Sequence, residues 1–190
     1  MTGASDRNER NALDLLCGGE WTCSNCNLVH QGMFDIGAIV PSMWPHAWDY
    51  EPNGALRLDG DFLSEDFCVL DGEFFMIRAV LDIPVHGLPE SFGYGVWCSL
   101  KKENFEAYVE HFDRGFDDHA EPWWSWLCNR ALPYYDHGES LGGLLYPRQG
   151  RLRPQFRVED QDHPLAVAQR DGISPEGVLA IYESYGHAPA

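Results

Sequence analysis

The clearest pattern of apolar and polar positions lies between residues 67 and 83. Residues 67–70 and 73–83 are apolar, β-rich runs, and Asp71-Gly72 separates them. Asp-Gly between two such runs is typical of a tight β-hairpin, because both central turn positions favour positive φ. Every second residue of the longer run is apolar, and these residues predict the face toward the core: Phe75, Ile77, Ala79, Leu81 and Ile83.

A second strand-like run passes directly into a helical pattern. Residues 92–100 alternate and predict the next strand, in which Gly93 and Gly95 predict the close approach of a bulky group such as a ring. From about Lys101 the apolar spacing changes to i, i+3, i+4 and i+7, which predicts a helix that ends near Gly115. Its apolar stripe consists of Phe105, Tyr108, Val109 and Phe112.

The last part of the chain predicts an edge strand and two helices. Residues 151–159 alternate between apolar and basic positions, and Pro154 favours an edge position. Each following helix has a proline near its first turn, at Pro164 and Pro175. Ser174 is the predicted cap of the second helix, and Asp162 or His163 is the predicted cap of the first.

Residues 41–52 contain three prolines, which make a regular element unfavourable. We expect an ordered loop there whose Trp44, Trp48 and Tyr50 cover part of the core. A binding surface made of the same rings is the alternative.

Together these elements predict an α+β fold with a twisted, mainly antiparallel sheet and helices packed on it. The length of 190 residues suits one domain, and we place that domain at residues 21–190. Residues 1–20 are the expected N-terminal extension, partly flexible, with a short helix at residues 12–16 before Gly18-Gly19.

Charge narrows the possible partners. The chain has 13 Lys and Arg against 30 Asp and Glu, a formal net charge of −17. This balance argues against nucleic-acid binding and favours a basic protein partner. No apolar run approaches the roughly 20 residues of a membrane-spanning helix, and residues 1–10 lack the apolar segment of a secretory signal. We therefore expect a cytoplasmic protein whose 6 cysteines are reduced thiols or metal ligands.

The strongest candidate chemistry is a cluster of soft ligands near the N-terminus. Cys23, Cys26 and His30 place two thiols and an imidazole in one short stretch. Zinc takes four Cys or His ligands in a tetrahedron, and a C-x-x-C turn presents two thiolates to one ion. We therefore predict a structural zinc site in a zinc-ribbon-like knuckle. The fourth ligand is not local; Cys68 on the hairpin strand is the first choice and Cys17 the second.

Other interpretations of the nucleophilic residues fit less well. A redox dithiol needs C-x-x-C at the start of a helix, and the residues after Cys26 do not predict one. Reduced thiols without a metal are the remaining alternative. Residues 138–142 match the G-x-S-x-G pattern of a serine nucleophile, but their flanks do not predict the strand and helix that this turn requires.

Arginines form a second group of candidate site residues. Arg151, Arg153 and Arg157 share one face of the predicted edge strand and could bind an anionic ligand. In so acidic a chain, pairing with neighbouring carboxylates is the favoured alternative. Arg78 shares a strand face with Asp82, which predicts an internal ion pair in preference to a substrate clamp.

Five blocks of the sequence, in this order, resemble a bacterial family known as domain of unknown function 2199. They are Cys23-x-x-Cys26-x-x-x-His30, RAVLDIP at 78–84, GVWCSLKKENF at 95–105, WLCN at 126–129 and DHPLAVAQRDGIS at 162–174. Ser125 stands where we would expect a glycine. The resemblance covers the chain from about Trp21 to the C-terminal helix. It implies domain boundaries and no activity, substrate or partner.

These observations favour a non-enzymatic binding or interaction protein with a structural zinc site and an acidic surface. The alternative is an enzyme with a small-molecule pocket between the Trp-rich segments, residues 41–52 and 122–127, and the Arg-bearing strand. An enzyme needs a concave pocket that holds an acid or base beside arginine or metal. An interaction protein needs an exposed aromatic or acidic patch instead. The sequence itself identifies no catalytic residue.

Overall fold

Two long antiparallel strands form the centre of the sheet. The computed structural model describes residues 5–117, 119–129 and 140–190. In it, β6 (Phe74–Pro84) pairs with β7 (Ser91–Leu100) over ten residue pairs. The prediction of a core face on β6 is confirmed, because its alternating residues are all buried: Phe75, Ile77, Ala79, Leu81 and Ile83.

The predicted hairpin precedes this pair of strands. β5 (Phe67–Leu70) pairs with the first residues of β6 in antiparallel fashion. Asp71 and Gly72 both adopt positive φ, 57° and 69°, as a turn of this kind requires. The turn also includes Glu73, whose N–H donates to the Leu70 carbonyl at 3.0 Å.

The remaining strands extend the central pair on both sides. They are β3 (Ile36–Gly37), β4 (Phe62–Leu63), β8 (Trp123–Trp126), β9 (Gly142–Tyr146) and β10 (Gln155–Val158). Within the described residues the larger sheet has the order β3-β7-β6-β10-β9-β8, and β5 shares one edge of β6 with β10. Strands β3 and β10 pair in parallel with their neighbours β7 and β6, and the other pairs are antiparallel. The predicted α+β, mainly antiparallel arrangement is therefore confirmed.

The helices are α1 (Ser5–Leu16), α2 (Lys102–His111), α3 (Pro164–Asp171) and α4 (Pro175–Ser184). The predicted caps are present, since the His163 side chain accepts from the Leu165 N–H and the Ser174 hydroxyl accepts from the Gly177 N–H. Helix α1 begins earlier than predicted, at Ser5. It packs against α4, and such tertiary contact stabilises helices that a polar sequence does not predict.

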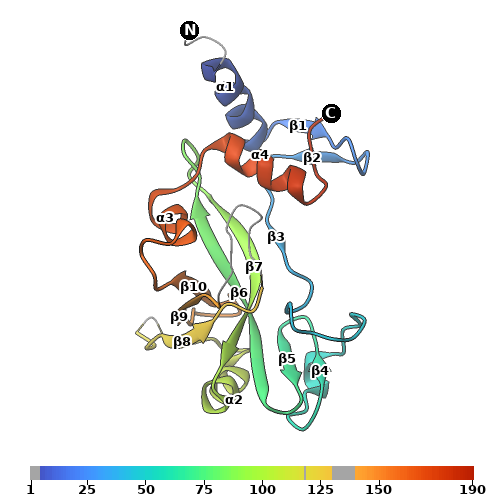
Figure 1. Ribbon diagram of the computed structural model, residues 1–190, viewed down its shortest axis with the longest axis vertical. Coiled ribbons are helices and arrows are strands. Elements are labelled where there is room, and N and C mark those ends of the chain that lie inside the picture. The colour runs from blue at the N-terminus through green and yellow to red at the C-terminus, as the bar shows by residue number, and fades with distance from the viewer. Residues whose placement is uncertain (1–4, 118, 130–139) are drawn as a thin grey trace.

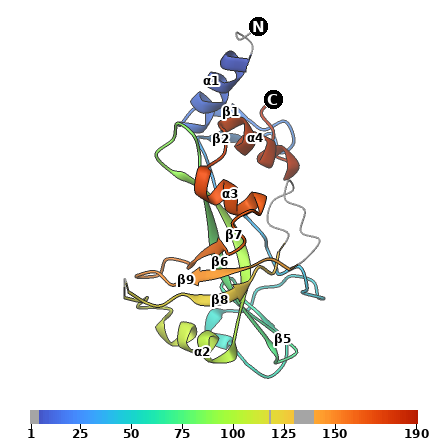
Figure 2. The same ribbon diagram turned by 60° about the vertical axis from the view of Figure 1, so that its left-hand side comes forward.

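Each end of the molecule holds both helical and strand elements. Figure 1 shows α1, α4 and the hairpin of β1 (Glu20–Thr22) and β2 (Val29–Gln31) at one end, and α2, β4 and β5 at the other. Strands β6 and β7 run between these groups. Figure 2 shows α3 between the α4 end and strands β8 and β9. In the described part of the chain, no helix is both long and apolar enough to cross a membrane.

The two glycines of β7 allow another part of the chain to approach closely, as predicted, but the approaching group is not a ring. The Gly93 N–H donates to the Asp35 carboxylate at 2.8 Å. A Cβ on Gly93 would lie 2.6 Å from that carboxylate, and Gly95 lies against the backbone of Gly37 on β3. The glycines therefore position β3 and the segment that leads into it.

A small second core lies apart from the main one. Its buried members are Leu63, Cys68, Leu70, Met76 and Trp97. Trp44 and Tyr50 of residues 41–52 pack against it, so the prediction that this segment covers core is confirmed for these two rings. It is wrong for Trp48, which is 61% exposed and makes its ring contact with Tyr50 at 6.1 Å. The short 3-10 helix η1 (Asn53–Ala55) follows this segment.

Arg78 interacts with the loop over this second core instead of Asp82. Its guanidinium donates to the Ala38 carbonyl and lies over the Trp97 ring, 5.3 Å from the centroid. Asp82 accepts a hydrogen bond from Gln155 at 2.9 Å. Side chains two residues apart on a strand share a face but start about 7 Å apart, so nearer groups on adjacent elements bind each of them.

Gly143 on β9 leaves no space for a side chain. A Cβ there would lie 2.2 Å from the Arg157 carbonyl oxygen and 2.6 Å from the Phe156 ring. We expect Gly143→Ala to lower the free energy of unfolding by about 2 kcal/mol through overpacking, measured by urea denaturation. Gly54→Ala in η1 is the matched control, because a Cβ there meets no atom within 4 Å. Equal losses in the two variants would contradict the expected overpacking.

Candidate metal centre

The hairpin of β1 and β2 positions three of the predicted ligands. Its register sets Trp21 opposite His30, the middle of the three residue pairs that join the two strands. The Cys23 N–H donates to the Leu28 carbonyl at 2.9 Å, and the Asn27 N–H donates to the Cys23 carbonyl at 3.0 Å. Asn27 has a φ of 57°, which asparagine tolerates better than most residues. This tight turn holds Cys23 and its neighbours in a compact loop.

The C-terminal segment returns to the same hairpin after α4. The Ser24 N–H donates to the Ala188 carbonyl at 2.8 Å, and the Ala190 N–H donates to the Thr22 carbonyl at 2.9 Å. Cys23 and Pro189 form an antiparallel bridge. Figure 1 shows the C-terminal end beside β1. The segment thereby carries a histidine, His187, to the cysteine turn.

Cys23, Cys26, His30 and His187, hereafter the Cys/His cluster, lie close enough to hold one metal ion. Their ligand atoms all fall within 4.8 Å of one another. Cys23 Sγ lies 3.8 Å from His187 Nδ1, and Cys26 Sγ lies 3.7 Å from His30 Nε2. Zinc with bonds of about 2.3 Å to sulfur and about 2.0 Å to nitrogen places its tetrahedral ligands roughly 3.3–3.8 Å apart. The observed spacing therefore requires only a small contraction.

Backbone groups of the turn favour a thiolate at Cys23. The Cys23 side chain is buried. The N–H of Cys26 lowers the pKa of Cys23 to about 6, helped by the N–H of Asn25 and the side chains of Cys26 and His187, while burial opposes the shift. A thiolate is the form that binds metal. At neutral pH the turn therefore stabilises the ligand form of this cysteine.

An aromatic stack supports the histidines. The His30 ring lies 4.6 Å from Trp21 and 4.9 Å from Phe34, measured between centroids. Phe34 stacks on Tyr182 of α4 at 4.2 Å, and the Tyr182 hydroxyl donates to the Phe34 carbonyl at 2.6 Å. Burial raises the pKa of Tyr182 to about 12, so its hydroxyl keeps its proton. The stack connects α4, which precedes His187, to the hairpin that carries His30.

The structure brings together Cys23, Cys26 and His30, as expected, with His187 as the fourth group. Cys68, the expected fourth ligand, lies instead in β5 within the second core, where burial raises its pKa to about 12. Cys17, the other option, is exposed and outside the cluster. His187 was missed because it follows Cys23 by 164 residues, and no local spacing connects the two. Its position outside the predicted helices and strands does not distinguish it, because other histidines, such as His86 and His119, share that feature.

The structure also locates the residues of the redox and serine-nucleophile interpretations and the predicted cap of α3. The C-x-x-C segment lies in a hairpin turn and does not begin a helix, so it lacks the context of a redox dithiol. His163 caps α3. The G-x-S-x-G segment at 138–142 lies partly outside the described residues and stays untested.

The predicted edge position is wrong, because β10 pairs with β6 on one side and with β9 on the other. The three arginines of the predicted face have different surroundings. Arg151 pairs with Asp113 at 2.6 Å, and Arg153 pairs with Asp66 at 3.1 Å. Arg157 lines a cavity between α3 and the sheet. No residue of 41–52 or 122–127 lines this cavity, so it differs from the pocket expected between the Trp-rich segments and the Arg-bearing strand.

The fold and the cluster define an α+β protein with a candidate Cys₂His₂ metal centre. The sequence model of one family, described as "Uncharacterized protein conserved in bacteria" (domain of unknown function 2199), matches residues 22–173. The chain belongs to this family. The match includes Cys23, Cys26 and His30 and ends before His187. No curated protein and no solved structure matched the chain.

The lowered pKa of Cys23 predicts a pH-dependent stability in the reduced, metal-free protein. Between about pH 6 and pH 8.5 the unfolded chain binds one more proton at this thiol than the folded chain does. The free energy of unfolding should therefore rise with pH in this window and lose the contribution as pH falls through about 6. Urea denaturation at pH 6, 7 and 8 with chelator present measures the slope.

The slope is proportional to the number of protons that the unfolded state binds in excess of the folded state, and we expect Cys23→Ser to reduce that number by about one. Cys17→Ser is the matched control, because Cys17 is exposed and outside the Cys/His cluster. An unchanged slope in Cys23→Ser would show that this thiol does not titrate in the stated window.

Proposed function

We propose that the Cys/His cluster binds one structural zinc ion. The observation that carries the proposal is the convergence of two thiols and two imidazoles within 4.8 Å. Sulfur and nitrogen donors of this kind suit zinc, and four protein ligands fill its tetrahedron. Catalytic zinc sites keep one position for water or substrate. A filled set of protein ligands therefore favours a structural role.

The ion would join two parts of the chain that are distant in sequence. Cys23, Cys26 and His30 come from the N-terminal hairpin, and His187 comes from the segment after α4. Backbone hydrogen bonds and the Phe34–Tyr182 stack also connect these parts. A metal bound in the folded state adds its binding free energy to folding. The zinc would accordingly stabilise the end of the molecule that holds α1 and α4.

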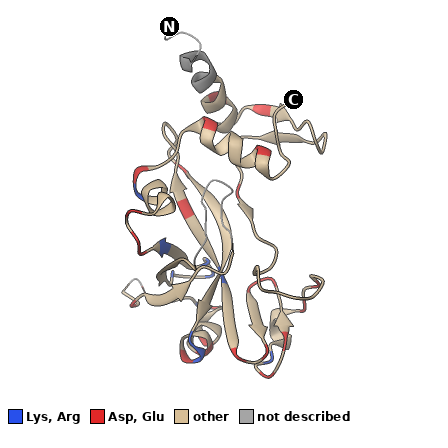
Figure 3. Cartoon of the chain, viewed as in Figure 1, with Lys and Arg blue, Asp and Glu red and all other residues tan. Residues whose placement is uncertain are grey.

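The protein itself would act by binding a basic partner and not by catalysis. Its net charge of −17 supports this part of the proposal. Several arginines are already paired with carboxylates, including Arg57, Arg151, Arg153 and Arg170. Figure 3 shows acidic residues along the helices and loops of both ends. A field of one sign steers an oppositely charged partner toward the surface.

Zinc content tests the metal site. Protein purified in reductant without chelator should contain about one zinc per chain by elemental analysis. His187→Ala should weaken zinc binding at least roughly tenfold, because loss of even an outer-shell contact costs that much. Cys68→Ala is the matched control, since Cys68 lies outside the Cys/His cluster and should leave occupancy unchanged. Less than about half an equivalent in the unmodified protein would exclude the structural zinc.

Salt dependence tests the acidic docking surface. Proteins captured by the tagged chain at about 0.1 M salt should be basic and should dissociate near 1 M, because the Debye length falls from about 10 Å to about 3 Å. An unrelated bait of similar net charge controls for non-specific capture. A specific partner that is retained equally at high salt would contradict electrostatic docking.

A further inference from the structure

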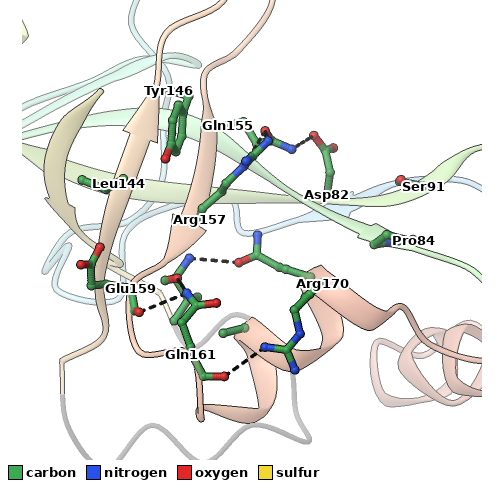
Figure 4. Close-up of a pocket in the computed structure, with 13 residues that line it drawn as sticks. Asp82, Pro84, Ser91, Leu144, Tyr146, Gln155, Arg157, Glu159, Gln161 and Arg170 are labelled. Atoms are coloured by element: carbon green, nitrogen blue, oxygen red, sulfur yellow. Dashed lines mark hydrogen bonds between the residues drawn. The ribbon is translucent and has the colours of Figure 1, made fainter. Parts of the chain in front are cut away.

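The cavity lined by Arg157 lies on one face of the sheet, away from the Cys/His cluster. Its volume is about 490 Å³, within the range of small-molecule sites. Strands β6, β9 and β10 form one side, and α3 with the segment before it forms the other. Figure 4 shows Arg157 and Tyr146 on neighbouring strands, with Arg170 and Gln161 across the cavity.

Arg157 presents an unused edge of its guanidinium group. Its Nε and Nη2 donate to Gln155 Oε1 at 3.1 and 2.9 Å, and its Cζ lies 4.9 Å from the centroid of the Tyr146 ring. No carboxylate of the described residues lies within 4.0 Å of its nitrogens. The Nη1–Nη2 edge therefore remains for two parallel hydrogen bonds to a carboxylate. Arg157 is exposed, and its contacts with Gln155 and the Tyr146 ring orient the guanidinium group.

Asp82 presents the opposite charge beside it. Its Oδ2 accepts from Gln155 Nε2 at 2.9 Å and lies 3.8 Å from Arg148 Nη1. The same Gln155 amide that accepts from Arg157 thus donates to Asp82, so one side chain orients both charged groups. The Arg157 guanidinium and the Asp82 carboxylate thus both line the cavity, and the Gln155 amide bridges them.

The second cation of the cavity is already neutralised. Arg170 donates to both oxygens of Asp171 at 2.9 Å and to the Gln161 carbonyl at 3.4 Å. Since Asp171 occupies its guanidinium, Arg170 does not compete with Arg157 for an anionic group. A multiply charged anion would also meet the carboxylates of Asp82 and Glu159, which line the cavity.

We propose that this cavity binds a free α-amino acid with an apolar side chain. The ligand carboxylate pairs with Arg157 and the ammonium group with Asp82. The apolar side chain contacts Leu144, Val158 and Ala166, which also line the cavity. A ligand without the carboxylate would leave Arg157 without a counterion, and one without the ammonium group would lose the contact with Asp82, whose Oδ2 otherwise lies 3.8 Å from Arg148 Nη1.

Binding of L-leucine, followed by ¹⁵N–¹H NMR, tests the assignment. L-leucine should shift amide signals of β9, β10 and α3 in a saturable manner. Two analogues each lack one charge: 4-methylpentanoate has no ammonium group, and 3-methylbutylamine has no carboxylate. Each should bind at least roughly tenfold more weakly, as loss of a hydrogen-bonded charge predicts.

Variants assign each charge to its residue. Arg157→Gln should weaken L-leucine roughly tenfold or more without weakening 3-methylbutylamine, and Asp82→Asn should weaken L-leucine similarly without weakening 4-methylpentanoate. Arg151→Gln is the matched control, because Arg151 is exposed, pairs with Asp113 and lies outside the cavity. Thermal melting confirms that each variant is folded.

Three results would overturn the assignment: no saturable shift with L-leucine, equal binding of 4-methylpentanoate and L-leucine, or unchanged L-leucine affinity in Arg157→Gln. The cavity contains none of the Cys/His cluster. The zinc measurements above therefore test the proposed function separately from this binding site.

Discussion

The antiparallel pairing of β6 with β7 is the interaction on which the other elements depend. The outer edge of β6 receives β5 near one end and β10 nearer the other, while the outer edge of β7 receives β3. The two faces of the pair also divide the core. Ile77 belongs to the main core, and the adjacent Met76 belongs to the second. A shift of one residue in this register would exchange the two sets of side chains.

Local patterns were sufficient to predict the elements that bury their own alternating residues. The hairpin at β5 and β6, the strand β7 and the start of α2 follow from spacing within a few residues. Elements stabilised by distant partners were harder to predict. The start of α1 depends on packing against α4, and the two-residue strand β3 depends on its approach to Gly95. Trp44 and Trp48 lie in the same proline-rich segment and could not be distinguished from the sequence, yet of these two rings only Trp44 packs on the second core.

The same distinction applies to the candidate sites. Cys23, Cys26 and His30 lie in one hairpin, so their proximity follows from the sequence. The fourth group depends on the path of the whole chain. All four residues of β5 are buried, so alternation did not indicate which core Cys68 faces. The alternating pattern of the sequence places Arg151 and Arg157 on one strand face. Only Arg157 lies within β10, whereas Arg151 lies in the preceding loop and pairs with Asp113.

The separation of 164 residues between Cys23 and His187 has a consequence for biosynthesis. A ribosome releases the hairpin with Cys23, Cys26 and His30 long before it releases the segment after α4. During that interval the nascent chain can offer three ligands and no fourth, so any captured ion keeps an open position. The Cys₂His₂ set forms only when residue 187 emerges and the last segment pairs with β1. The candidate Cys/His cluster would thus be complete only after translation has passed residue 187, and chains terminated before that residue would lack its fourth group.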